Sequence, residues 1–123
     1  MKRILIIDDD TNIRTIIGDI LSIAGYEPLI AVDGDEGLKL LTENPCTLII
    51  TDLIMPEKEG IETIIEAKKS SPGIKIIAIS GGGRIGATDY LSVASKIGAD
   101  ATLAKPFRNQ ELVDLVENMI GAP

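Results

Sequence analysis

Four short apolar runs of this chain each end in polar residues that can do chemistry. The runs cover residues 4–7, 48–51, 76–79 and 103–104, and the polar residues that follow them are Asp8 with Asp9, Asp52, Ser80 and Lys105. If the runs are parallel strands, their carboxyl ends meet at one edge of a sheet, where open α/β sheets bind ligands. We therefore expect three carboxylates, a hydroxyl and an ammonium group to converge on one site.

Three neighbouring carboxylates repel one another unless a cation lies among them. Mg²⁺ takes oxygen ligands, commonly one or two carboxylates together with phosphate oxygens. An exposed aspartate beside such a cation can attack phosphorus and form an aspartyl phosphate. The pattern predicts metal-assisted phosphoryl chemistry, with Asp8 and Asp9 in the metal site and Asp52 as the acceptor. Asp10, the third acid of its run, is expected to cap a helix.

The other two polar positions suit a phosphoryl group. Ser80 precedes three glycines at 81–83 without the Gly-Lys-Ser/Thr ending of a Walker loop. We interpret Ser80 as a hydroxyl that bonds a phosphoryl oxygen, in a loop that moves when the bond forms. Lys105 is the one cation at the carboxyl end of a predicted strand, where it would neutralise a phosphoryl oxygen. The Lys105–Pro106 bond is a candidate cis peptide.

Composition narrows the class of protein. The 123 residues predict a single domain. A net charge of −7 argues against direct binding of nucleic acid or an anionic membrane. The chain has no histidine, which excludes histidine bases and His-ligated zinc. We find no signal peptide and no apolar stretch of transmembrane length, so we expect a cytoplasmic location. The single cysteine, Cys46, is expected to be a half-buried packing residue.

Strand-like and helix-like patterns alternate five times along the chain. The predicted strands cover residues 4–7, 28–32, 47–51, 74–79 and 101–104. The predicted helices cover about 13–24, 34–41, 61–68, 90–97 and 112–120. Gly25 and Gly98 are expected to end two of these helices, and Asp33 with Glu36 resembles a capping box.

Five such units predict a doubly wound, flavodoxin-like α/β fold, with five parallel strands and five helices on both faces of the sheet. The first, third and fourth strands are the most continuously apolar, so we place them in the centre. Pro28 and the shortness of the fifth strand suit the edges. The expected order is 2-1-3-4-5, whose switch point lies between strands one and three.

Taken in this order, the motifs resemble the receiver domain of bacterial response regulators. The motifs are Ile6-Ile7-Asp8-Asp9, residues 51–56 (TDLIMP) with Gly60, Ile79-Ser80-Gly81, and Gly98-Ala99-Asp100 leading to Lys105-Pro106-Phe107. The resemblance covers essentially the whole chain. It gives residues 1–121 as the receiver domain and 122–123 as a frayed tail or the start of a linker.

The resemblance implies a role for each polar position. Asp52 would accept a phosphoryl group from a sensor histidine kinase or a histidine phosphotransfer protein. Ser80 would switch towards that group and Lys105 would be its counter-ion. The domain would catalyse its own phosphorylation and dephosphorylation without being an enzyme in the ordinary sense.

The same resemblance implies a metal and an output. Mg²⁺ (or Mn²⁺) would be bound directly by Asp9, Asp52 and the backbone carbonyl of Ile54, with Asp8 acting through water. The signal would pass to a downstream effector protein or domain through the face made by the fourth helix, fifth strand and fifth helix. A homodimer formed on activation is left open.

One position departs from the common pattern, and two others lie where the family tunes hydrolysis. Thr102 stands where many receivers carry Tyr or Phe, three residues before the lysine. Output through rotation of an aromatic ring is therefore an open question here. Ile54 and Gly82, at positions that tune hydrolysis in the family, lack a polar side chain, which predicts a long-lived phosphorylated state.

Three other classes of protein share part of this pattern. An aspartate-nucleophile phosphatase of the haloacid dehalogenase type would use Asp8 and Asp10, but Asn12 departs from its first motif and the required acidic pair does not follow Lys105. A flavodoxin-like cofactor binder would need a phosphate loop where this chain has three aspartates. A receiver-fold interaction module that works without phosphorylation would not need all five site residues.

Overall fold

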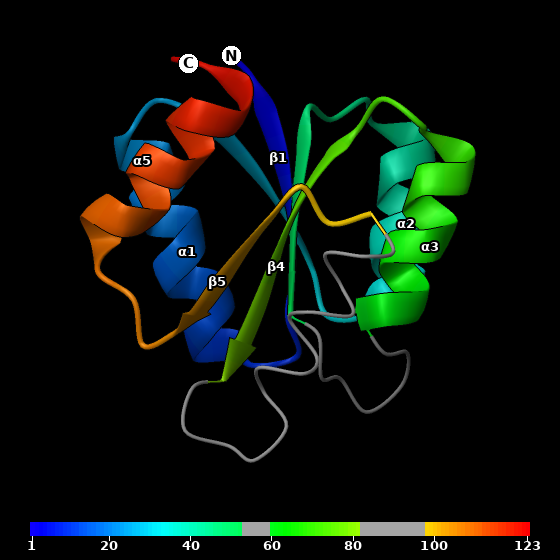
Figure 1. The fold of residues 1–123 in the computed structure, drawn as a ribbon, viewed down its shortest axis with the longest axis horizontal. Coiled ribbons are helices and arrows are strands. Elements are labelled where there is room, and N and C mark those ends of the chain that lie inside the picture. Colours follow the sequence, from blue (N-terminus) through cyan, green and yellow to red (C-terminus); the bar gives the residue numbers. More distant parts are fainter. Residues whose placement is uncertain (53–59, 82–97) are drawn as a thin grey trace.

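A parallel sheet covered by helices on both faces forms the protein (Figure 1). The computed structural model describes residues 1–52, 60–81 and 98–123. The strands are β1 (Arg3–Ile7), β2 (Glu27–Ala31), β3 (Leu48–Asp52), β4 (Lys75–Gly81) and β5 (Ala101–Lys105). The described helices are α1 (Thr11–Ile23), α2 (Gly34–Glu43), α3 (Gly60–Ser70) and α5 (Asn109–Ile120). Helices α1 and α5 lie on one face of the sheet, and α2 and α3 lie on the other (Figure 1).

The sheet order is β2-β1-β3-β4-β5 with every pair parallel, which confirms the predicted doubly wound topology. Four of the five predicted helices are present in the described ranges, and the helix predicted over residues 90–97 lies outside them. None of the described helices is long and apolar enough to cross a membrane.

The predicted helix boundaries hold with one correction. Gly25 follows α1 with φ 102°, in the left-handed region that favours glycine, as expected for a residue that ends a helix. Asp33 caps α2 by accepting the backbone N–H of Glu36 at 2.9 Å. The carboxylate of Glu36, however, accepts the N–H of Val32 at 3.0 Å, so the reciprocal bond of the expected capping box falls one residue earlier.

Successive residues of β1 enter two different cores. Ile4 and Ile6 pack in the cluster beneath α1 and α5, and Leu5 and Ile7 pack in the cluster beneath α2 and α3. All four side chains are at most 1% exposed. Side chains of a strand alternate between the faces of the sheet, so a strand that is covered on both faces must be apolar throughout. This explains the unbroken run of aliphatic residues before Asp8.

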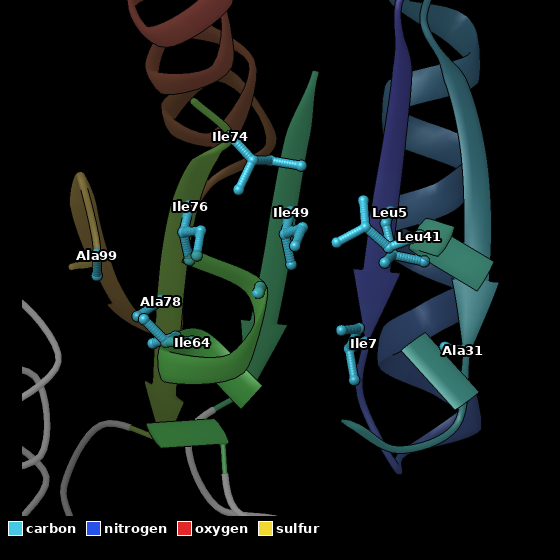
Figure 2. Close-up of a cluster of buried hydrophobic side chains, with 11 residues drawn as sticks. Leu5, Ile7, Ala31, Leu41, Ile49, Ile64, Ile74, Ile76, Ala78 and Ala99 are labelled. Atoms are coloured by element: carbon cyan, nitrogen blue, oxygen red, sulfur yellow. The ribbon is translucent and has the colours of Figure 1, made fainter. Parts of the chain in front are cut away.

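Aliphatic side chains build the core on the α2 and α3 side (Figure 2). Ile49 of β3 pairs with Leu5 of β1 on one side and with Ile76 of β4 on the other, and Ile64 of α3 packs in the same cluster. The cluster contains no aromatic residue among its buried members. It holds the carboxyl ends of β1, β3 and β4 in fixed register beside one another.

The two ends of the described chain meet at the amino ends of the strands (Figure 1). The ammonium of Lys2 donates a hydrogen bond to the carbonyl of Ile120, and the hydroxyl of Tyr26 donates to the carbonyl of Gly121 at 2.7 Å. Pro123 lies against Gly25, where an added Cβ would come within 2.9 Å of the proline ring. The last residues therefore contact the body of the domain.

Two helical glycines provide a test of this packing. A Cβ added at Gly37 of α2 would lie 2.8 Å from Cγ1 of Ile7, whereas one added at Gly18 of α1 would make an ordinary 3.5 Å contact with Ile30. Alanine favours a helix by about 1 kcal/mol over glycine, so Gly18→Ala should raise the free energy of unfolding by up to about that amount. Gly37→Ala should lower it by about 1 kcal/mol, because overpacking against Ile7 outweighs the same gain.

Urea unfolding of both variants, followed by circular dichroism, measures this difference. Equal stabilities of Gly18→Ala and Gly37→Ala would contradict the close approach of α2 to Ile7.

Candidate metal centre

Three carboxylates meet at the carboxyl ends of β1 and β3. Asp8 and Asp9 directly follow β1, and Asp52 is the last residue of β3. Ile7 pairs with Thr51 in the sheet, so the acids that follow these two residues are neighbours. One carboxylate oxygen from each acid lies within 4.8 Å of the other two. The predicted convergence of the three acids is present.

The three carboxylates differ in exposure. Asp8 is 2% and Asp52 is 9% exposed, whereas Asp9 is open to solvent. Asp52 was expected to be an exposed carboxylate at the mouth of the crevice, and this was wrong. It ends β3, a central strand in which all five residues are buried.

Hydrogen bonds and burial define the state of Asp8. Its Oδ1 accepts the backbone N–H of Asp10 at 2.9 Å, and its own N–H donates to the carbonyl of Ala31 at 3.2 Å. Burial is the largest influence on Asp8 and raises the pKa of its carboxyl above the ordinary value, although the Asp10 N–H bond lowers it. The charge of Asp52 raises the pKa further, and Lys105 lowers it.

Lys105 brings a positive charge to the cluster from β5. Its Nζ lies 3.3 Å from Oδ2 of Asp8 and 3.6 Å from Oδ2 of Asp52. The lysine ends β5, where it pairs with Gly81 at the end of β4. The peptide bond between Lys105 and Pro106 is cis, as anticipated. The predicted counter-ion therefore contacts two of the three acids.

The structure describes the backbone of Ser80 but not the position of Ile54. Ser80 lies in β4 and pairs with Ala104, so its backbone is at the same edge of the sheet as the acids. Ile54 lies outside the described residues. Asp10 does what was expected of it: its carboxylate caps α1 by accepting the backbone N–H of Asn12 at 2.8 Å.

Arg14 also reaches this site and was missed from the sequence. Its Nη1 donates to the backbone carbonyl of Asp8 at 2.8 Å, and its Nη2 donates to Oγ1 of Thr11 at 3.0 Å. A basic side chain near the start of a helix opposes the helix dipole. That unfavourable position was the one indication in the sequence that Arg14 has a specific partner.

This set of residues fits a hard divalent cation. Asp8, Asp9 and Asp52 offer three carboxylate oxygens close enough to share one ion. Lys105 and Arg14 carry fewer positive charges than these acids carry negative ones. Partly buried carboxylates that are left unbalanced are costly, and a divalent ion would remove that cost.

The family model of the response regulator receiver domain matches residues 4–117. The chain belongs to the response regulator receiver family. It is 36% identical over 127 residues to the response regulator receiver protein CpdR of Brucella abortus, with 99% of each chain covered.

Solved receiver structures share the fold. A receiver domain protein from Clostridium thermocellum superposes with a TM-score of 0.90 at 36% identity, covering 98% of this chain and 94% of that one. The response regulator TrrA of Thermotoga maritima, solved in complex with Mg²⁺-BeF, superposes with a TM-score of 0.86 at 34% identity, covering 98% of this receiver and all of TrrA (100%).

Family membership settles the class of function. The chain is a receiver domain of two-component signalling, and its cluster of Asp8, Asp9 and Asp52 is typical of the phosphoacceptor site of such domains. Response regulators work with histidine kinases and effector domains. The interpretations as a haloacid dehalogenase phosphatase or a flavin-binding protein are therefore set aside.

The raised pKa of Asp8 makes a prediction about the metal-free receiver. Because the fold favours the protonated acid, the stability from this group is full below the unfolded pKa of 3.8 and is lost as the pH rises through the folded pKa. We expect Asp8→Asn to be more stable than the wild type at pH 7 in EDTA, with a difference that shrinks towards pH 4. Urea unfolding across this pH range measures it.

Asp10→Asn is the control, because asparagine caps a helix as well as aspartate does and should change the stability at pH 7 by less than about 0.5 kcal/mol. A destabilised Asp8→Asn at pH 7 would show instead that pairing with Lys105 outweighs burial.

Proposed function

We propose that Asp52 accepts a phosphoryl group from a histidine kinase or a histidine phosphotransfer protein, with Mg²⁺ (or Mn²⁺) held among Asp8, Asp9 and Asp52. The observation that carries this proposal is the meeting of the three carboxylates at the ends of β1 and β3, with Lys105 3.6 Å from Asp52. The complex of TrrA with Mg²⁺-BeF supports the same chemistry for a similar fold.

The sheet order favours Asp52 over the other acids as the acceptor. Strand β3 lies between β1, which carries Asp8 and Asp9, and β4, which carries Ser80. A phosphoryl group on Asp52 would therefore have acids that can hold a cation on one side and the strand that carries Ser80 on the other. Asp8 is 2% exposed against 9% for Asp52, and its Oδ1 accepts the N–H of Asp10, so its oxygens are less accessible to phosphorus.

The transfer itself needs little from the protein beyond position and charge. A carboxylate oxygen of Asp52 attacks phosphorus, and the bond from phosphorus to the imidazole nitrogen of the donor breaks. The electron pair stays on the imidazole, which takes a proton from solvent. Lys105, which faces Asp52 before transfer, then pairs with a phosphoryl oxygen. The divalent ion supplies charge neutralisation at the phosphoryl oxygens.

The finer assignments are part of the same proposal. Asp9, Asp52 and the carbonyl of Ile54 would be direct ligands of the metal, and Asp8 would act through water. Ser80 would bond the phosphoryl group, and release by water would be catalysed by the same residues. We take residues 1–121 as the domain, with the cytoplasm as its setting.

The partners follow from the chemistry of the site. The upstream partner is a protein phosphohistidine, and the downstream partner is an effector protein or domain that reads the face made by the predicted fourth helix, β5 and α5. Thr102 of β5 is exposed. The net charge of −7 opposes direct contact with nucleic acid. Activation by formation of a homodimer is a further outcome for the phosphorylated protein.

Intact mass spectrometry tests the acceptor. After incubation with acetyl phosphate and Mg²⁺, the wild type should gain one phosphoryl group and Asp52→Asn should gain none. Asp10→Asn, a control in the same acidic run, should behave as the wild type because Asp10 is a cap and not a member of the cluster. EDTA should abolish the adduct.

The other outcomes each have a meaning. An adduct that persists in Asp52→Asn would show that another residue is the acceptor. If the wild type gains no phosphoryl group from acetyl phosphate or from a phosphorylated histidine phosphotransfer protein, the domain is an interaction module that works without phosphorylation.

Lys105 provides a second test, through its competition with the metal. Its ammonium contacts two of the three acids, so Lys105→Met should strengthen Mg²⁺ binding by roughly tenfold while slowing phosphorylation. Lys68→Met is a matched control: Lys68 is 24% exposed against 21% for Lys105, but it pairs with Asp100. Titration calorimetry with Mg²⁺ would contradict the assignment if both variants bound the ion as the wild type does.

A further inference from the structure

We infer that Arg14 is a positioning residue of the metal site, which fixes the peptide between Asp8 and Asp9 so that the Asp9 carboxylate faces the cation. The inference rests on the proposed metal site. It adds to that site a residue of α1, which does not lie at the end of a strand. Arg14 touches none of the reacting atoms. It acts through the backbone that carries two of the acids.

The guanidinium of Arg14 bridges the turn between β1 and α1. Its Nη1 donates to the carbonyl of Asp8 at 2.8 Å, before the turn, and its Nη2 donates to Oγ1 of Thr11 at 3.0 Å, after it. The backbone N–H of Arg14 donates to the carbonyl of Asp10 at 3.0 Å, which anchors the side chain to the start of the helix. Asp9 lies inside the segment that these bonds enclose.

Asp9 is the acid that most needs such support. Asp8 is held by the N–H of Asp10 and by Lys105, and Asp52 is held in a central strand. Asp9 is exposed, and within the part of the chain that the structure describes its carboxylate has no hydrogen-bond donor. Because the peptide unit is planar, fixing the carbonyl of Asp8 also fixes the orientation at which the Asp9 Cα leaves it.

An arginine at position 14 is electrostatically unfavourable for two reasons. A cation near the start of a helix opposes the dipole, and a cation beside a metal site repels the ion. Both effects act against Arg14 at its observed position. The two hydrogen bonds of Arg14 hold the peptide that carries Asp9, and this role explains why an arginine occupies the position.

Lysine separates the geometric role from the role of charge. It keeps the positive charge but cannot reach two acceptors with a planar fork. If Arg14 acted through charge alone, Arg14→Lys would bind Mg²⁺ as the wild type does and Arg14→Gln would bind it more tightly. If Arg14 acts through position, both variants should bind more weakly.

Calorimetric titration of the unphosphorylated protein with Mg²⁺ makes this comparison. We expect Arg14→Lys and Arg14→Gln to bind the ion roughly 10-fold more weakly, as is typical when a partner that orients a metal ligand is lost. Arg3→Lys is the matched control, since Arg3 is also half-buried and paired, with Glu27 at 2.5 Å, but lies at the other end of β1. It should bind Mg²⁺ as the wild type does.

Phosphorylation by acetyl phosphate gives a second readout. In Arg14→Lys, the Mg²⁺ concentration at half-maximal rate should rise by about the same factor as the dissociation constant. The rate at saturating Mg²⁺ should return to near the wild-type value, which a general loss of structure would not allow. Thr11→Val, which removes one acceptor of the fork, should show a smaller weakening and carries the test if the Arg14 variants do not fold.

The outcomes separate this inference from the proposed function. Arg14→Lys with wild-type Mg²⁺ affinity, or Arg14→Gln with tighter binding, would overturn the positioning role while the phosphoacceptor remains. A wild type that fails to bind Mg²⁺ would remove the metal site itself, and with it both proposals.

Discussion

Repulsion among three carboxylates at the ends of adjacent strands is the constraint on which the rest of the structure depends. Asp8, Asp9 and Asp52 cannot stay this close without positive charge, and β5 supplies the ammonium of Lys105 across the end of β4. The two aliphatic cores hold the strand ends in register against that repulsion. The repulsion is confined to one edge of the sheet, and a divalent cation held among the three acids would relieve it.

The clustered acids therefore lower the stability of the metal-free domain. Burial raises the pKa of Asp8, so at neutral pH the charged form of this carboxyl lowers the stability of the folded state. Natural proteins commonly retain such unfavourable groups where function needs them. Here the cost is confined to one edge of the sheet, and the continuous apolar strands behind that edge are free to be as stable as packing allows.

Most of the fold and the main acids could be predicted because they follow from local patterns. Unbroken aliphatic runs mark strands that are buried on both faces, and a polar residue after such a run marks its carboxyl end. The burial of Asp52 depends on how elements pack, which the order of residues does not contain. The bond from the Val32 N–H to Glu36 depends on the path of the turn between β2 and α2, which residue types alone do not fix. Arg14 was missed because its partner outside α1 is the backbone carbonyl of Asp8, and a backbone acceptor leaves no mark in the sequence.

The meeting of the chain ends at the amino side of the sheet has a consequence for the architecture of larger proteins. Lys2 bonds to Ile120 and Tyr26 to Gly121 at the pole opposite the acidic cluster (Figure 1). A domain fused at either end would be attached at the end of the sheet opposite the acidic cluster. The same closeness makes the domain suitable for circular permutation, and for insertion as a cassette into a loop of another protein.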